Sequence, residues 1–111
     1  MDKYVVYTIE VDGLFYVGSC GSLRQETRFS EHKQTLRRNN HSKKLQEKYN
    51  SLQHPEVKFK RIRYFEADNL YQRQREEEIE MRRLERKGTE IANKNRYDNN
   101  GRGITKRPYT L

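Results

Sequence analysis

Cysteine, proline and long apolar runs are all scarce in this sequence. Its 111 residues include one cysteine, Cys20, two prolines and no tryptophan. A single cysteine excludes an internal disulfide and a cysteine-rich zinc site. No apolar run approaches the roughly 18 residues of a membrane-spanning helix, and the N-terminus lacks the pattern of a secretory signal. We therefore expect no membrane partner and an intracellular location, in the cytoplasm of a host cell or in a nucleus if the source is eukaryotic.

Charge is what the sequence has in excess. Charged residues make up 36% of the chain and hydrophobic residues only 32%, so the core is thin. The length suits one small domain. The formal net charge of +8 favours a polyanionic partner, most often nucleic acid, with an anionic membrane surface as the lesser alternative.

A hairpin signal lies near the start of the chain. Asp12-Gly13 favours a type I′ turn, and apolar residues alternate on both sides of it over residues 4–11 and 14–19. Counting outward from the turn gives the expected pairs: Val11 with Leu14, Ile9 with Tyr16, and Tyr7 with Gly18. Because side chains alternate across a strand, Tyr7 and Tyr16 project from one face, and Gly18 leaves space beside them.

Three helices and one further strand are predicted after the hairpin. The helices cover residues 23–38, 41–52 and 68–87, and the strand covers residues 57–65 with a bulge near Lys60-Arg61. The predicted fold class is α/β (α+β), with a small three-stranded antiparallel sheet flanked by three helices. We place the domain at residues 1–92 and expect residues 93–111 to form a basic, loosely ordered C-terminal tail.

Helical periodicity turns several polar groups toward one face of this sheet. Arg28 and His32 lie on the stripe of the first helix that faces the protein, Glu77 lies on that of the third, and His41 stands at the start of the second. With the two hairpin tyrosines they form the candidate set: Tyr7, Tyr16, Arg28, His32, Glu77 and, as a candidate sixth, His41. Each alone has a structural explanation, such as a core tyrosine, a packing histidine or an Arg28–Glu77 ion pair. Together they are harder to explain as packing, because burying several charges in a small domain costs free energy.

The candidate set suits hydrolysis of a phosphodiester. A single carboxylate can hold a divalent ion that keeps most of its waters, as Mg²⁺ prefers. Such an ion polarises the phosphoryl oxygen. Arginine offers a planar fork to phosphate oxygens. A histidine or a tyrosine can take the proton from an attacking water.

At these positions the sequence resembles the GIY-YIG nuclease domain. Val5-Val6-Tyr7 stands where that family has Gly-Ile-Tyr, and Tyr16-Val17-Gly18 stands where it has Tyr-Ile-Gly. The segments that begin at Arg28 and at His41 are similar to the family's segments on the first and second helices. Glu77 takes the place of its metal-binding glutamate, and Asn93 that of the asparagine after its third helix. The resemblance covers roughly residues 3–95, with a valine in place of the first glycine and a spacer, residues 8–15, that is short for the family.

The resemblance implies a metal-dependent DNA endonuclease with one Mg²⁺ (or Mn²⁺) ion per site. It implies that Glu77 binds the metal, that Arg28 stabilises the phosphate, and that Tyr7 is the general base with help from Tyr16 and His32. His41 would contact the phosphate or the leaving group. Three assignments stay open on the residues alone: Tyr7 or His32 as the base, Glu76 or Glu78 in place of Glu77, and Asn95 in place of Asn93.

Further side chains are expected to contact DNA, either double-stranded or branched. They are Lys43, Lys44, Asn93, Lys94, Arg96, Arg102, Lys106 and Arg107. Phosphate contacts from a basic tail position DNA without reading its bases, so we expect low sequence specificity, or specificity gained by homo-oligomerisation. A compact nuclease of this kind would suit a phage or mobile element. The alternatives are a nucleic-acid-binding protein without catalysis and a partner-binding subunit that uses the charged face of residues 68–87.

Overall fold

The two strands of the predicted hairpin form the centre of the structure. In the computed structural model, which describes residues 2–53 and 55–104, β1 (Asp2–Val11) and β2 (Leu14–Gly21) pair antiparallel. The register matches the prediction, with Val11 opposite Leu14, Ile9 opposite Tyr16, and Tyr7 opposite Gly18. Asp12 and Gly13 have φ angles of 47° and 83°, the left-handed values that a type I′ turn requires. The predicted hairpin is therefore confirmed.

A long third strand pairs with the other side of β1. β3 (Val57–Ala67) runs antiparallel to β1, and the register shifts between Val6 and Tyr7. Ile62 is thus the extra residue of a β-bulge, next to the position predicted for it. Because of this bulge, Phe59 and Phe65, which an unbroken strand would direct to the same face, pack on opposite faces of the sheet.

The sheet has a fourth strand, so the prediction of three antiparallel strands is incomplete. β4 (Glu90–Ile91) pairs parallel with β2 at Leu14 and Phe15, which gives a mixed sheet of order β3-β1-β2-β4. The backbone N–H of Ala92 also donates to the carbonyl of Phe15, at 2.6 Å. A strand of two residues is too short to show a period of two, so the sequence carries no pattern for it. Beyond Phe15, the outer edge of β2 pairs with no strand in the described part of the chain.

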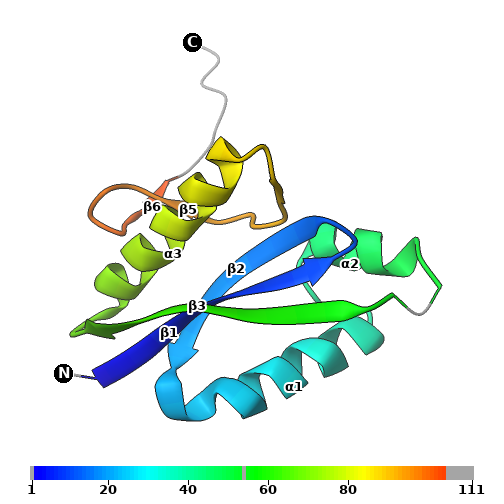
Figure 1. Ribbon diagram of the computed structural model, residues 1–111, viewed down its shortest axis with the longest axis horizontal. Helices are drawn as coiled ribbons and strands as arrows, with labels where there is room; N and C mark the ends of the chain where they lie inside the picture. The colour runs from blue at the N-terminus through cyan, green and yellow to red at the C-terminus, as the bar shows by residue number, and fades with distance from the viewer. Residues whose placement is uncertain (1, 54, 105–111) are drawn as a thin grey trace.

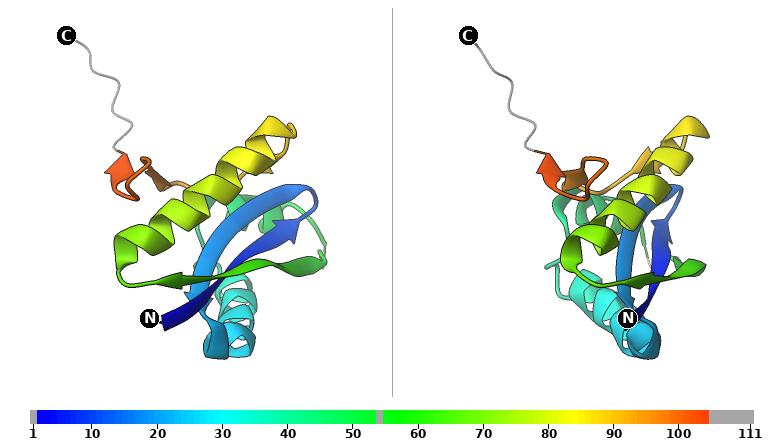
Figure 2. Two further views of the ribbon diagram at one scale, coloured as in Figure 1. Left: turned by 60° about the vertical axis from the view of Figure 1, so that its left-hand side comes forward. Right: turned by 90° about the vertical axis from the view of Figure 1, so that its left-hand side faces the viewer.

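Helices cover both faces of this sheet (Figures 1 and 2). After a 3₁₀ turn at Ser22–Arg24, α1 (Gln25–Arg37) and α2 (Lys43–Asn50) pack on one face, and α3 (Leu70–Arg86) packs on the other. The α1–α2 side holds a core that includes Ile9, Leu36 and Leu45, and the α3 side holds Val6, Val17, Met81 and Leu84. Within the described ranges, no helix combines the length and apolarity needed to cross a bilayer. The fold is a small α+β domain with a mixed four-stranded sheet and three helices.

Residues 93–104 differ from the predicted loosely ordered tail. β5 (Arg96–Tyr97) and β6 (Gly103–Ile104) pair antiparallel beside α3. Arg96 donates to the carboxylate of Glu78 at 2.6 Å and to that of Glu85 at 2.7 Å. Glu78 is only 3% exposed, so this arginine neutralises a buried carboxylate of α3 and holds the segment in place. Residues 105–111, with the predicted DNA contacts Lys106 and Arg107, lie outside the described residues.

Candidate active site

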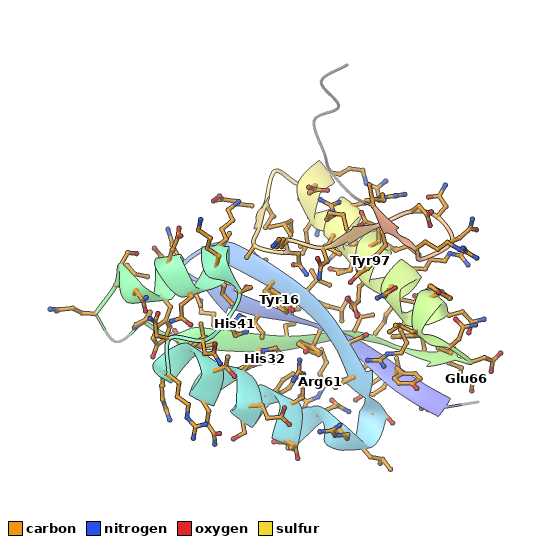
Figure 3. All side chains as sticks on the ribbon, turned by 180° about the vertical axis from the view of Figure 1, so that it is seen from behind. Tyr16, His32, His41, Arg61, Glu66 and Tyr97 are labelled. Atoms are coloured by element: carbon orange, nitrogen blue, oxygen red, sulfur yellow. The ribbon has the colours of Figure 1, made fainter. Side chains whose placement is uncertain are left out.

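The candidate side chains meet at the unpaired edge of β2. Arg28, His32 and His41 approach from α1 and the start of α2, on the same face as the two tyrosines. Glu77 approaches from α3 on the other face, so the expectation that all six share one face is wrong. The two groups come close because β2 has no partner strand at this point. Figure 3 shows Tyr16, His32 and His41 gathered beside β2.

Tyr7, His32 and His41 form a continuous chain of hydrogen bonds. The Tyr7 hydroxyl is 2.7 Å from His32 Nε2, and His32 Nδ1 is 2.9 Å from His41 Nε2. The chain ends at His41 Nδ1, to which the backbone N–H of Ser42 donates at 2.7 Å. Tyr7 and His32 are 1% and 4% exposed, so the first bond is shielded from water.

The terminal backbone N–H sets the direction of every bond in this chain. An N–H only donates, so His41 Nδ1 is an acceptor and neutral His41 carries its proton on Nε2. That proton is donated to His32 Nδ1, which places the His32 proton on Nε2, directed at the Tyr7 oxygen. Burial, with the charge of Arg28, lowers the pKa of His32 to about 3, so His32 is neutral near pH 7. The Tyr7 oxygen accepts from His32, and its own proton is available to another acceptor.

Two substitutions at His41 test this direction. His41→Leu removes the donor to His32 Nδ1, whereas His41→Gln keeps an amide N–H of similar reach. ¹⁵N NMR of the His32 ring should show a protonated Nε2 and a bare Nδ1 in the native protein and in His41→Gln, and a change of tautomer in His41→Leu. Loss of this partly buried hydrogen bond should also lower any DNA-cleavage rate by roughly tenfold in His41→Leu alone. A protonated His32 Nδ1 in the native protein would contradict the chain.

Gly18 and Arg28 complete the surroundings of the Tyr7 hydroxyl. A Cβ atom at Gly18 would lie 2.6 Å from that oxygen, so the close approach requires glycine. Burial raises the pKa of Tyr7 well above its usual value, while the charge and hydrogen bond of Arg28 act to lower it. Arg28 also pairs with Glu31 at 3.1 Å, and 40% of its side chain is exposed. Arg28 therefore contacts the buried phenol and solvent at once.

Tyr16 lies between the histidine pair and the carboxylate. Its ring centroid is 5.2 Å from that of His41, with the two rings almost perpendicular. Burial raises the pKa of Tyr16, and the nearby Glu77 carboxylate raises it further, whereas Arg28 lowers it. Tyr16 is therefore a neutral phenol near both Glu77 and Arg28.

Glu77 is set apart from its acidic neighbours on α3. Its carboxylate accepts a hydrogen bond from the Ser19 hydroxyl at 2.5 Å and forms no ion pair within the described residues. Glu76 and Glu78 both form ion pairs with arginines, at 3.1 and 2.6 Å. Arg28 pairs with Glu31 instead of Glu77, so the structural ion pair considered above is absent from the described part of the chain. Glu77 is the carboxylate of this run that is left for a ligand.

The chemistry of this carboxylate fits a divalent ion with one protein ligand. No group of three or more His, Cys, Asp or Glu side chains suited to a metal occurs among the described residues. Mg²⁺ keeps several waters and is often held by one or two carboxylates. Burial raises the pKa of Glu77 to about 7, although Ser19, Arg73 and Arg28 lower it. A half-buried carboxylate without an ion-pair partner among the described residues is a group whose charge a cation would stabilise.

Glu77 also predicts a pH dependence of stability in the absence of metal. Its native pKa of about 7 exceeds the usual 4.5, so between these values the native state binds more protons than the unfolded chain. The free energy of unfolding should therefore fall as pH rises through this window, by at most ~3 kcal/mol. Glu77→Gln lacks this loss.

Denaturant unfolding in chelator measures the effect. Glu77→Gln should be as stable as the native protein near the low end of the window and more stable above it, and Mg²⁺ should stabilise the native protein alone. Parallel pH profiles for the two proteins would show that desolvation does not raise the pKa of Glu77.

The side chains expected to contact DNA fall into two groups: some are held by contacts within the protein, and the others are exposed to solvent. Asn93 binds the edge of β2: its amide accepts from the backbone N–H of Val17 and donates to the carbonyl of Val17, both at 2.8 Å. It replaces a neighbouring strand there, and Arg96 is held by α3 as described, so we assign both residues to structure. Lys44 pairs with Glu90 at 3.1 Å. The exposed members that remain are Lys43, Lys94 and Arg102, and Asn95 is exposed as well.

Three residues of this region were not anticipated from the sequence. Ser19 holds Glu77, Arg73 donates to the carbonyl of Ser19 at 3.1 Å, and Ser42 directs the histidine pair. Arg73 lies four residues before Glu77 and therefore on the same face of α3, a spacing that the sequence does display. Ser19 and Ser42 leave no such signal. Ser19 contacts Glu77, which lies 58 residues away on α3, and Ser42 acts through its backbone N–H, which every residue except proline has.

Comparisons with known proteins add nothing to this picture. Searches of family models, of curated proteins and of solved structures gave no match to this chain. Any functional conclusion therefore has to come from the residues and their geometry.

Proposed function

We propose that this protein is a metal-dependent DNA endonuclease of the GIY-YIG kind, which hydrolyses phosphodiester bonds at the edge of β2. The observation that supports this most is the meeting of a phenol, a half-exposed guanidinium and a carboxylate without an ion-pair partner at one strand edge, around Tyr7, Arg28 and Glu77. The net charge of +8 suits DNA as the substrate. We expect it to act inside cells, with low sequence specificity.

Arg28 would bind the phosphate. Its guanidinium offers planar donors to two phosphate oxygens, and a phosphate would compete for it with Glu31, whose side chain is 40% exposed and weakly held. Turning toward the phosphate would also move Arg28 relative to the Tyr7 hydroxyl, whose pKa its charge lowers. The same movement of Arg28 would then bind the substrate and open access to the Tyr7 hydroxyl.

Tyr7 would be the general base. His32 has no free lone pair, because Nε2 carries its proton and Nδ1 accepts from His41, so it is poorly suited to take a proton from water. It can instead donate to the Tyr7 oxygen and, together with the charge of Arg28, stabilise the phenolate that remains after Tyr7 has lost its own proton to solvent. That phenolate would then take the proton from the attacking water. This favours Tyr7 over His32, and it gives His41 a positioning role in place of a phosphate contact.

Glu77 would hold the Mg²⁺ or Mn²⁺ ion, with Ser19 orienting its carboxylate. When bound, such an ion polarises the phosphoryl oxygen and stabilises the departing oxygen. Tyr16 lies near both Glu77 and Arg28, where its hydroxyl can donate to a phosphate oxygen. Tyr7, Tyr16, Arg28 and Glu77 would thus act at the same phosphate, and His32 and His41 would position Tyr7.

A binding protein without catalysis is the second candidate. The observation that favours it is the 1% exposure of Tyr7, which keeps the proposed base away from water unless Arg28 moves. Incubation with supercoiled plasmid and branched DNA, with Mg²⁺ and then with chelator, separates the two candidates. Metal-dependent nicking supports the nuclease. Binding that weakens steeply with salt and never leads to cleavage on any substrate would leave the binding protein.

A further inference from the structure

A cationic hollow lies beside the proposed catalytic residues. Its volume is about 810 Å³, and its charged lining consists of Lys3 from β1, Arg24 and Arg28 from the segment after β2, Glu31, and Arg73 from α3. Four cations thus face one carboxylate. Glu31 is shared by Arg24 and Arg28, at 3.4 and 3.1 Å.

Two of these cations lack a direct contact with a carboxylate in the part of the chain that the structure describes. Within the described residues neither Lys3 nor Arg73 forms an ion pair. Several other basic residues of the sheet and of α3 do, including Arg63, Arg82 and Arg83. Lys3 and Arg73 line a hollow together with two further cations, so their lack of an ion-pair partner leaves positive charge at one place on the surface.

Arg73 is held rigidly although it is unpaired. Its Nη2 donates to the carbonyl of Ser19 at 3.1 Å, and its guanidinium lies 4.6 Å from the ring centroid of Tyr4. Its Nε is buried and has no hydrogen-bond partner among the described residues. A guanidinium fixed by a carbonyl and an aromatic ring, with a donor left unused, is preorganised for an anion.

Ser19 joins the hollow to the proposed metal ligand. Its hydroxyl donates to Glu77, and its backbone carbonyl accepts from Arg73. An anion beside Arg73 would therefore lie next to, but not at, the phosphate held between Arg28 and Glu77. Phosphates of one DNA strand follow one another at about 3.4 Å of helical rise, so a strand that places one phosphate at Arg28 carries the next one to a neighbouring position.

We propose that this hollow binds a second phosphate of the cleaved DNA strand, with Arg73 and Lys3 as its ligands. This inference rests on the proposed function for the place of the first phosphate. The hollow would fix the direction of the strand across the edge of β2, which a single phosphate contact at Arg28 cannot do.

Metal-free DNA binding tests the proposal, because chelator removes cleavage from the measurement. The affinity for a short DNA duplex is measured over a series of KCl concentrations for the native protein, Arg73→Gln, Lys3→Gln and Arg75→Gln. Arg75 is the matched control: it lies on the same helix, changes the charge equally, and lines a different hollow. Arg73→Gln and Lys3→Gln should each lower the slope of log affinity against log salt by about 0.9 and weaken binding roughly tenfold, and Arg75→Gln should change the slope much less.

Equal changes in the salt slope for Arg73→Gln and Arg75→Gln would overturn the proposal, because they would show that DNA responds only to the total charge of the protein. Lys3→Gln keeps the test valid if Arg73→Gln does not fold, because Lys3 is exposed on the sheet and its substitution should not affect folding.

Binding of inorganic phosphate is a further measurement. If phosphate shifts the NMR signal of Arg73 Nε but Arg73→Gln binds DNA as the native protein does, the hollow takes free phosphate and the proposal is wrong.

The outcomes separate this inference from the proposed nuclease. If Arg73→Gln and Arg75→Gln differ in salt slope but no DNA is nicked, the hollow binds a phosphate and the proposed nuclease activity is wrong. If the native protein nicks DNA but the two variants have equal salt slopes, the nuclease activity is supported and the hollow is not a phosphate site.

Discussion

Tyr7→Phe is expected to lower the rate of Mg²⁺-dependent DNA cleavage by about 10²- to 10⁴-fold, the contribution of a general base. The phenyl ring keeps the packing against Phe29, whose centroid is 5.4 Å away, but the oxygen that takes the proton is gone. The substitution also leaves the buried His32 Nε2–H without an acceptor, which should cost roughly 1–3 kcal/mol of stability. Single-turnover nicking of supercoiled plasmid gives the rate, and denaturant unfolding gives the stability.

Tyr49→Phe is the control for this loss. Tyr49 packs against the core that contains Tyr7. The variant therefore removes a tyrosine hydroxyl from the same face of the sheet and leaves the Tyr7–His32–His41 chain intact. It should retain native cleavage. A Tyr7→Phe protein that is folded and cleaves at more than about a tenth of the native rate would remove Tyr7 from the chemistry.

Glu77→Gln should abolish the dependence of cleavage on metal and lower its rate by about a thousandfold or more, because several kcal/mol of transition-state stabilisation would come from the bound ion. The amide keeps the size of the side chain and can still bond Ser19, so the fold should persist. Binding of DNA in chelator should be at least as tight as in the native protein, since a negative charge has been removed.

Glu76→Gln provides the matched control from the same helix. Glu76 pairs with Arg63 at 3.1 Å and is 27% exposed in its side chain, so this variant should lose some stability and keep its activity. Cleavage that survives in Glu77→Gln and fails in Glu76→Gln would reverse the assignment of the ligand.

The hairpin and its tyrosines were predictable because their signals are local. The Asp12-Gly13 turn fixes the register over a few residues, and that register alone places Tyr7 opposite Gly18. Gly18 then gains its role from direct contact with the Tyr7 hydroxyl. Valine at position 5 also finds an explanation, because its side chain is fully buried in the α1–α2 core.

The placement of α3 was not predictable, because it depends on ion pairs between distant segments. Nothing in the sequence distinguishes Glu78 and Glu80 from the exposed charged residues of α3, yet they are 3% and 0% exposed. Arginines from β3, from the same helix and from the segment after β4 neutralise them. Such partners are spread along the chain and leave no periodicity, so the sequence does not reveal that α3 buries a charged side. For the same reason Arg96 looked like part of a free basic tail.

One measurement tests most directly whether Glu77 and Tyr7 act on the same phosphate. Tyr7→Phe should bind DNA and metal without cleaving quickly, so it can be crystallised with a duplex and Mn²⁺, and anomalous scattering then locates the ion. The expected result is a single manganese peak on the Glu77 carboxylate, with a phosphate between that ion and Arg28 and with the substituted phenyl ring beneath it. Ordered DNA elsewhere on the protein, or manganese bound at Glu78 or Glu80 with none at Glu77, would contradict a catalytic site at the edge of β2.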